Sequence, residues 1–262
     1  MGAEETLLAF SAAVLGLILG SFGTVVAYRI PRRESFLKGR SKCPACGHTI
    51  AARDNIPVFS FALQRGRCRH CGEPISWRYP AMEIATAALF VVAALRFGLS
   101  VEAVVYAAFF WTLVVLAAID LEHKLLPNRV VYPAFVVGWA GLALGALLDG
   151  SPERLLDAAI GALTFGGLLF LVAFIYPAGM GGGDVKLAFV LGTFLGYVGG
   201  IGVTLVGMFL AFLLGGIIGV VVMVATGGNR KYQLPFGPFL ASGTIIAIVA
   251  GIPLLNAYLG SF

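Results

Sequence analysis

Residues 187–224 read LAFVLGTFLGYVGGIGVTLVGMFLAFLLGGIIGVVVMV, a run of 38 residues without a charged side chain. A helix needs about 20 apolar residues to cross the hydrocarbon of a bilayer, so this run is long enough for two crossings. Apolar runs of similar length recur along most of the chain. We therefore expect eight membrane-spanning segments, at residues 6–28, 80–98, 101–119, 129–148, 155–176, 184–199, 201–226 and 236–258.

The composition also indicates a membrane protein. Of the 262 residues, 59% are hydrophobic and only 12% are charged, far from the balance of a soluble domain. Because lipid offers the backbone no hydrogen-bond partner, the spans must be helices, and the expected fold class is an all-α polytopic membrane protein. Glycines of the seventh span should permit close packing. They are Gly207, Gly215, Gly216 and Gly219.

The basic residues predict the orientation of the spans. Residues 29–78 contain 11 of the 18 lysines and arginines, and segments of this kind face the cytoplasm. The N-terminus then lies outside, and threading eight spans puts most other basic residues on the cytoplasmic side. These are Lys124, Arg129, Lys186, Arg230 and Lys231. The net charge of +5 thus reflects topology and attraction to the lipid bilayer, with no need for a nucleic-acid partner.

The polar segment between the first two spans contains all four cysteines of the chain, as two CxxC pairs. They are Cys43, Cys46, Cys68 and Cys71. Two such pairs, each followed by a glycine that suits a tight turn, are typical of a zinc ribbon with four thiolate ligands. Disulfides are the alternative, but a cytoplasmic segment is kept reduced. Four protein ligands leave no place for water, so the expected Zn²⁺ is structural, and His48 and His70 are expected to face solvent.

The chain is therefore expected to have three parts. Residues 1–29 form the first transmembrane helix, residues 30–79 the cytoplasmic zinc-binding segment, and residues 80–262 a core of seven helices. A basic zinc ribbon could also bind nucleic acid, but this one has few aromatic residues for stacking on bases and adjoins an anionic lipid surface.

Two aspartates stand at the ends of predicted spans, where ionisable residues are costly and mark function. Asp120 ends the third span and Asp184 opens the sixth, after Gly181-Gly-Gly183. The orientation deduced from the basic residues puts both at the cytoplasmic face, so they can meet. Two adjacent carboxylates share a proton, as a general acid and base around an attacking water do. The pattern therefore predicts an aspartyl protease.

Other interpretations of these residues remain open. Asp184 could instead be the N-cap of a helix that begins at a glycine hinge. Lys186 is expected either to extend toward the lipid surface or to form an ion pair with Asp184. Glu122 and His123 are expected in a loop after Asp120, where they either support it or are merely solvated.

Together with several short motifs, these residues make the chain resemble the type IV prepilin peptidases, which are bifunctional leader peptidases and N-methyltransferases of bacterial pilus and type II secretion systems. The motifs extend over nearly the whole chain. They are Gly20-Ser-Phe22, Tyr28-Arg29-Ile-Pro31, both CxxC pairs, Asp54-Asn55-Ile-Pro57, Arg65-Gly-Arg67, Ile75-Ser76, Arg78-Tyr79-Pro80 with Glu83, Ile119-Asp120, Leu126-Pro127, residues 181–184, which resemble the GxGD signature of presenilins, and Pro235-Phe-Gly237-Pro238.

The resemblance implies that Asp120 and Asp184 are the catalytic pair of a prepilin peptidase in the bacterial inner membrane. Its substrates would be prepilins or pseudopilins, whose basic leader lies in the cytoplasm ahead of a hydrophobic helix. The new N-terminus would then be methylated from S-adenosylmethionine, because the cysteine-bearing segment is associated with the methylating form. No glycine-rich nucleotide-binding motif is visible, so the residues that bind S-adenosylmethionine are not predicted.

The chain departs from the family pattern at three positions. Thr24 stands where many members have asparagine, Asn128 where an aspartate often follows Leu-Pro, and Glu122 where a second aspartate is common. None of them removes the aspartate pair, and they bear instead on the methyltransferase site. The alternatives are a leader peptidase without methyltransferase activity, a proton- or cation-coupled transporter that uses both aspartates, and a membrane-anchored zinc-ribbon adaptor without catalysis.

Overall fold

The computed structural model describes residues 2–37, 39–177, 180–225 and 234–260, so Arg230 and Lys231 lie outside the described residues. Within these ranges the chain forms helices and two isolated β-bridges, with no strand. Seven of the described helices are long and apolar enough to cross a membrane. The predicted all-α polytopic fold is therefore confirmed.

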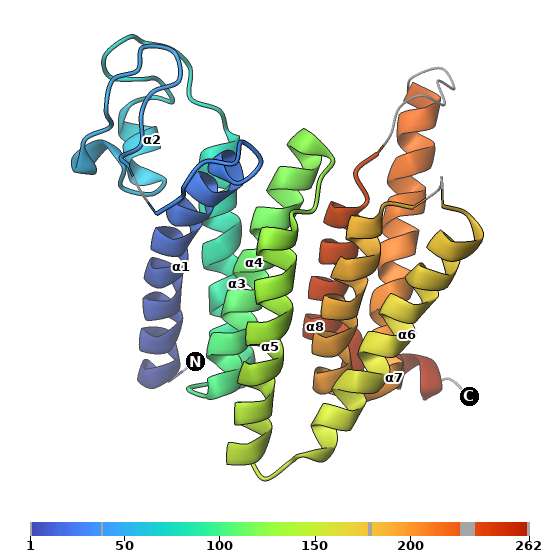
Figure 1. The fold of residues 1–262 in the computed structure, drawn as a ribbon. Coiled ribbons are helices and arrows are strands. Elements are labelled where there is room, and N and C mark those ends of the chain that lie inside the picture. Colours follow the sequence, from blue (N-terminus) through green and yellow to red (C-terminus); the bar gives the residue numbers. More distant parts are fainter. Residues whose placement is uncertain (1, 38, 178–179, 226–233, 261–262) are drawn as a thin grey trace. The chain divides into compact units, whose positions relative to one another are not determined.

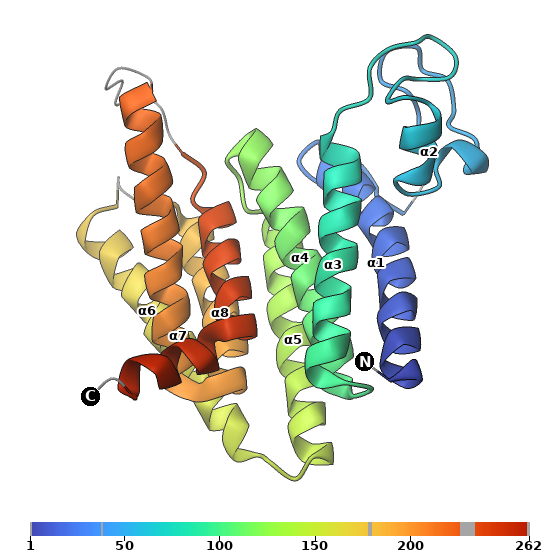
Figure 2. The ribbon, with the colours of Figure 1, turned by 180° about the vertical axis from the view of Figure 1, so that it is seen from behind.

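The chain forms two compact units, Met1–Ile119 and Asp120–Phe262, and helix α4 continues from one into the other. In the first unit, the bounds of the elements are α1 (Ala3–Arg29), the short 3-10 helix η1 (Ala52–Asp54), α2 (Phe59–Leu63), α3 (Arg78–Phe97) and α4 (Val101–His123). The polar segment with α2 lies over the end of α1 and the beginning of α3 (Figure 2). The predicted division of the chain into three parts, with boundaries at residues 29/30 and 79/80, remains a prediction.

Helices α1 and α3 pack closely because glycines face α3. A Cβ on Gly16 would lie 2.6 Å from the Cα of Ala87, and one on Gly20 would lie 2.8 Å from the Cα of Glu83. Glycines four residues apart on one helix face permit this approach of two backbones. Helix α4 joins the pair through Trp111, whose Nε1 donates a hydrogen bond to the Leu19 carbonyl oxygen at 2.8 Å.

In the second unit, α4 ends and is followed by α5 (Asn128–Leu148), α6 (Glu153–Ile175), α7 (Gly182–Ala225) and α8 (Gly237–Leu259). Prolines stand at the starts of α5, α6 and α8, where a helix does not need the missing N–H. Helix α7 packs against α5, α6 and α8. Its contact with α6 is close at Gly161 and Gly192, where a Cβ on either glycine would collide with the carbonyl oxygen of the other.

Helix α7 contains two crossings joined by a sharp reversal (Figure 1). Its 44 residues would be about 66 Å long if straight, more than twice the hydrocarbon thickness. Gly199 and Gly200 depart from helical geometry, and the φ of +65° at Gly200 favours glycine. Beyond them the chain folds back, since a Cβ on Gly207 would lie 2.7 Å from Leu195 Cδ1. The predicted end of one span at 199 and start of the next at 201 is confirmed.

The glycines predicted to mediate close packing differ in their surroundings. Gly207 contacts Leu195, and Gly215 lies near Phe236, where an added Cβ would be 3.0 Å from the ring. At Gly216, an added Cβ would meet no described atom within 4 Å, so the prediction is wrong there. The reason is helical periodicity, because Gly215 and Gly216 point about 100° apart and only one can face the same neighbour.

Candidate functional site

Asp120 and Asp184 line one cavity of the second unit, although 64 positions separate them in the sequence. Asp120 lies in the last turn of α4 and Asp184 in the first turn of α7. The cavity has a volume of about 330 Å³ and is lined by the segments 120–128 and 181–186. The two carboxylates are close enough to interact electrostatically. The structure thus brings together the two aspartates that the sequence singled out.

The carboxylate of Asp120 is held by the first residue of α8. Asp120 is only 5% exposed, and its Oδ2 accepts a hydrogen bond of 2.9 Å from the backbone N–H of Gly237. The first N–H groups of a helix have no partner within it, so they are suited to bind an anion. A Cβ on Gly237 would lie 2.7 Å from the same oxygen, so any larger residue would displace the carboxylate.

Sequence reasoning did not assign Gly237 a role. It was noted only as part of the motif Pro235-Phe-Gly237-Pro238, which follows the last polar segment. A glycine between two prolines at a helix start was the available signal. Nothing local connected it to Asp120, which lies 117 positions earlier.

The glycines before Asp184 let other groups approach its carboxylate. A Cβ on Gly181 would lie 3.0 Å from Asp184 Oδ2, and one on Gly183 would lie 3.0 Å from Leu126 Cβ. Helix α7 begins at Gly182, and the N–H of Asp184 donates to the Gly181 carbonyl oxygen at 3.0 Å. Asp184 is therefore inside the first turn of the helix. The alternative interpretation, in which Asp184 is the N-cap residue, is wrong.

The polar neighbours of the pair are arranged differently from the sequence expectation. Lys186 Nζ donates to Asn128 Oδ1 at 3.1 Å and lies 5.5 Å from the Tyr132 ring centroid, and in the described ranges it forms no ion pair with Asp184. Glu122 and His123 belong to the last turn of α4 instead of the predicted loop. The helix ends only after His123, where Lys124 takes the left-handed conformation that commonly terminates helices, with a φ of 51°.

The four cysteines of the first unit form a second cluster. Their Sγ atoms all lie within 4.8 Å of one another, and the structure records all four as free thiols. The Cys43 and Cys71 Sγ atoms are 3.8 Å apart. A tetrahedron with metal–sulfur bonds of about 2.3 Å has edges of about 3.8 Å, so the cluster has the dimensions of a tetrathiolate metal site.

The two CxxC pairs have the same local structure. Cys43 donates its N–H to the His48 carbonyl oxygen at 2.9 Å, and Cys68 donates to that of Glu73 at 2.8 Å. The glycine after each pair closes the turn with a positive φ, 69° at Gly47 and 74° at Gly72, as the sequence predicted. The two knuckles therefore present their thiols to one point.

The surroundings of the thiols also fit a bound cation. The backbone N–H groups of Cys71 and His70 lower the pKa of the Cys68 thiol to about 7. For Cys71, the N–H of Glu73 lowers the pKa, but burial and the adjacent thiols raise it, with a net result of about 12. Four thiolates this close repel one another unless a metal ion compensates their charge. His48 and His70 are exposed, and their rings contact each other at a tilt of 32°, with centroids 3.5 Å apart.

Comparison with known proteins assigns most of the chain to one family. The family model described as "Bacterial Peptidase A24 N-terminal domain" matches residues 14–97. The model described as "Type IV leader peptidase family" matches residues 107–224. No solved structure matches the chain.

Curated relatives match over most of their length. A protein of Bacillus subtilis is 36% identical over 94% of this chain and 96% of its own, and one of Pseudomonas putida is 34% identical over 92% and 90%. A protein of Myxococcus xanthus is 39% identical over 82% of this chain but only 63% of its own length. Each is named prepilin leader peptidase/N-methyltransferase. The chain therefore belongs to the type IV leader peptidase family and is an enzyme.

Proposed function

We propose that the chain cleaves the basic leader from prepilins or pseudopilins, with Asp120 and Asp184 as the catalytic pair. The observation that carries this proposal is the single cavity lined by both carboxylates at the ends of two helices. The names of the relatives support the substrate class. Membership of a leader peptidase family also favours a protease over the transporter and the adaptor that the sequence left as alternatives.

The two carboxylates can divide the work of hydrolysis. One takes a proton from a water molecule, which attacks the carbonyl carbon of the scissile peptide bond, and the other donates a proton to the departing amine. The Gly237 N–H keeps Asp120 in place. The glycines before Asp184 leave room for an extended substrate backbone beside it.

Cleavage on the cytoplasmic side of a bacterial inner membrane is part of the proposal. It is supported by the concentration of lysine and arginine in residues 29–78 and by Lys124 and Lys186, which line the cavity with the aspartates. A prepilin leader, which is basic, would remain on the same side. The membrane would hold the hydrophobic helix of the substrate beside the catalytic cavity.

The second proposed activity is N-methylation of the new N-terminus from S-adenosylmethionine. The relatives' names include it. The family resemblance associates a cysteine-bearing segment with methylation, and this chain has such a segment. We infer that Cys43, Cys46, Cys68 and Cys71 bind Zn²⁺, because four thiolates in a tetrahedron suit this ion. Zinc would supply structural order, since all four positions are occupied by protein.

Product masses test both activities together. The purified full chain in detergent is incubated with a synthetic prepilin, with and without S-adenosylmethionine. We expect loss of the leader mass in both reactions and a further gain of one methyl group only with S-adenosylmethionine. Cleavage without any methylated product would identify a leader peptidase alone, and an uncut substrate would contradict the proposal.

The hydrogen bond from Gly237 leads to a specific prediction. Gly237→Ala should lower kcat/KM for cleavage about tenfold to a hundredfold, because it displaces Asp120 and removes a hydrogen bond to a charged group. Gly216→Ala is the matched control, since its added Cβ meets no described atom. Initial rates of leader release measure the effect. Equal rates for Gly237→Ala and the wild type would show that the contact does not position the carboxylate.

The proposed zinc site leads to another prediction. Elemental analysis should find about one zinc per chain, and Cys43→Ser should make residues 30–79 more sensitive to limited proteolysis, because the ion joins the two knuckles. Ala45→Ser, in the same exposed turn, keeps all four thiols and should behave as the wild type. A wild type without metal and with an equally protected segment would exclude the site.

A further inference from the structure

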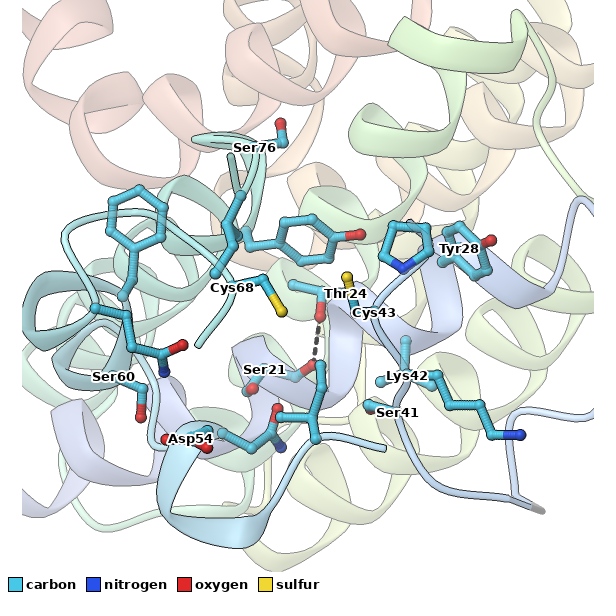
Figure 3. A pocket seen from close by; sticks show the side chains of 18 of the residues that line it. Ser21, Thr24, Tyr28, Ser41, Lys42, Cys43, Asp54, Ser60, Cys68 and Ser76 are labelled. Atoms are coloured by element: carbon cyan, nitrogen blue, oxygen red, sulfur yellow. Dashed lines mark hydrogen bonds between the residues drawn. The ribbon is translucent and has the colours of Figure 1, made fainter. Parts of the chain in front are cut away.

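The first unit contains a cavity of about 600 Å³ that the proposed peptidase site does not use. It lies between the second half of α1, the first turns of α3 and the cysteine segment, and Figure 3 shows Ser21, Thr24 and Tyr28 of α1 on one side of it. Small-molecule sites in proteins usually have volumes of about 300–1,000 Å³. The cavity therefore has room for a cofactor-sized ligand.

Glu83 places a buried carboxyl group at this cavity. It is 7% exposed, lies in the second turn of α3, and its Oε2 accepts a hydrogen bond of 2.7 Å from the N–H of Val58. No lysine or arginine among the described residues forms an ion pair with it. Asp54 differs, because Arg69 Nη2 lies 2.7 Å from its Oδ1. A buried carboxylate without a cation is costly, so Glu83 is suited to a positively charged ligand.

The backbone beside Glu83 is strained. Val58 has a φ of +58°, a conformation that β-branched residues rarely adopt, and its N–H is the donor to Glu83. Strain of this kind persists only where the surroundings enforce it, and it is concentrated at ligand and active sites. The strained residue and the buried carboxylate thus mark the same wall of the cavity.

Other lining groups suit a nucleoside. Tyr28 and Tyr79 offer aromatic rings on which a base can stack. Thr24 Oγ1 donates to the Ser21 carbonyl oxygen at 2.7 Å, so this hydroxyl oxygen can still accept a hydrogen bond from a ribose. Cys43 and Cys68 also line the cavity, so the cysteine cluster forms part of one of its walls. These residues combine a carboxyl group, aromatic rings and a hydroxyl group. The lining also contains basic side chains, which suit the carboxylate of an amino-acid ligand: Arg29, Arg40, Lys42 and Arg69.

We propose that this cavity binds S-adenosylmethionine, with the sulfonium group near Glu83; the proposal rests on the methyltransferase activity proposed above. A sulfonium nucleoside has the cation, the base and the ribose that the lining groups match. In the transfer, the sulfur–methyl bond breaks as the nitrogen–methyl bond forms. S-adenosylhomocysteine leaves with the sulfur electron pair, and the amine nitrogen loses one proton to water.

A binding experiment isolates the charge of the ligand. The zinc-loaded full chain in detergent is titrated calorimetrically with S-adenosylmethionine and with S-adenosylhomocysteine, which lacks the sulfonium charge. Glu83→Gln should weaken binding of S-adenosylmethionine roughly tenfold to a hundredfold and that of S-adenosylhomocysteine much less. Glu102→Gln is the matched control, because Glu102 is a buried carboxylate of the same unit that does not line the cavity. Zinc content and the unfolding temperature verify that the variants fold.

A second measurement needs no variant. Ultraviolet crosslinking of radiolabelled S-adenosylmethionine to the wild type should label peptides within residues 21–83. Label in the second unit, or equal affinities for Glu83→Gln and the wild type, would overturn this site. If either of these results is found but the wild type still methylates a pre-cut pilin, the site is wrong and the proposed methyltransferase function stands. A wild type that neither binds the donor nor methylates would overturn the function and the site together.

Discussion

Asp120→Asn and Asp184→Asn should each lower the rate of leader cleavage about 1,000-fold or more. Asparagine preserves the shape of the side chain but can neither accept the proton of the attacking water nor donate one to the leaving amine. Because both groups act in one proton relay, the double variant should be no slower than either single variant. Rates of product formation from a synthetic prepilin, followed by mass spectrometry, measure this.

Asp149→Asn provides the matched control. Asp149 belongs to the same unit but is exposed, with its Oδ2 3.9 Å from Arg154 Nη1, and it does not line the cavity of the two aspartates. Its variant should cleave at the wild-type rate. The three single variants should unfold at similar temperatures, which would show that a loss of cleavage is not caused by a loss of folding. Turnover above a few per cent in either single variant of the pair would mean that the dyad is not the catalytic group.

The transmembrane architecture was largely predictable because it depends on local composition. A run of about 20 apolar residues has few alternatives to a membrane helix, and the end of one span at Gly199 was visible as a pair of glycines inside an overlong run. The meeting of Asp120 with Asp184 was also predictable in outline. The distribution of basic residues assigned both helix ends to one side, which made contact between them possible.

The contacts that complete both sites were not predictable, because they join distant positions without a periodic signal. Gly237 holds Asp120 across 117 residues, and Val58, directly before α2, holds Glu83 of α3 across 25 residues. Helix packing was similar. Gly161 and Gly192 let α6 and α7 approach closely, yet nothing in the sequence distinguishes them from Gly216, which makes no such contact with the described residues.

The two activities should be separable by mutation, and this is the other large effect that we expect. The aspartates lie in the second compact unit and the cysteines in the first. Both aspartates line one cavity, and Cys43 and Cys68 line another. Full-length prepilin cannot reveal the difference, since the methyl acceptor is the amine that cleavage creates. A synthetic mature pilin N-terminus removes this dependence.

With that pre-cut substrate, Asp184→Asn should methylate at the wild-type rate although it no longer cleaves prepilin. Cys68→Ser should have the reverse pattern and lose methylation more than cleavage, because Cys68 belongs both to the cysteine cluster and to the wall of the proposed donor cavity. Ala45→Ser should change neither activity. Incorporation of a radiolabelled methyl group and release of the leader are measured on the same preparations. If the folded cysteine variant lost both activities equally, the two reactions would share one site, and the division of chemistry between the units would be wrong.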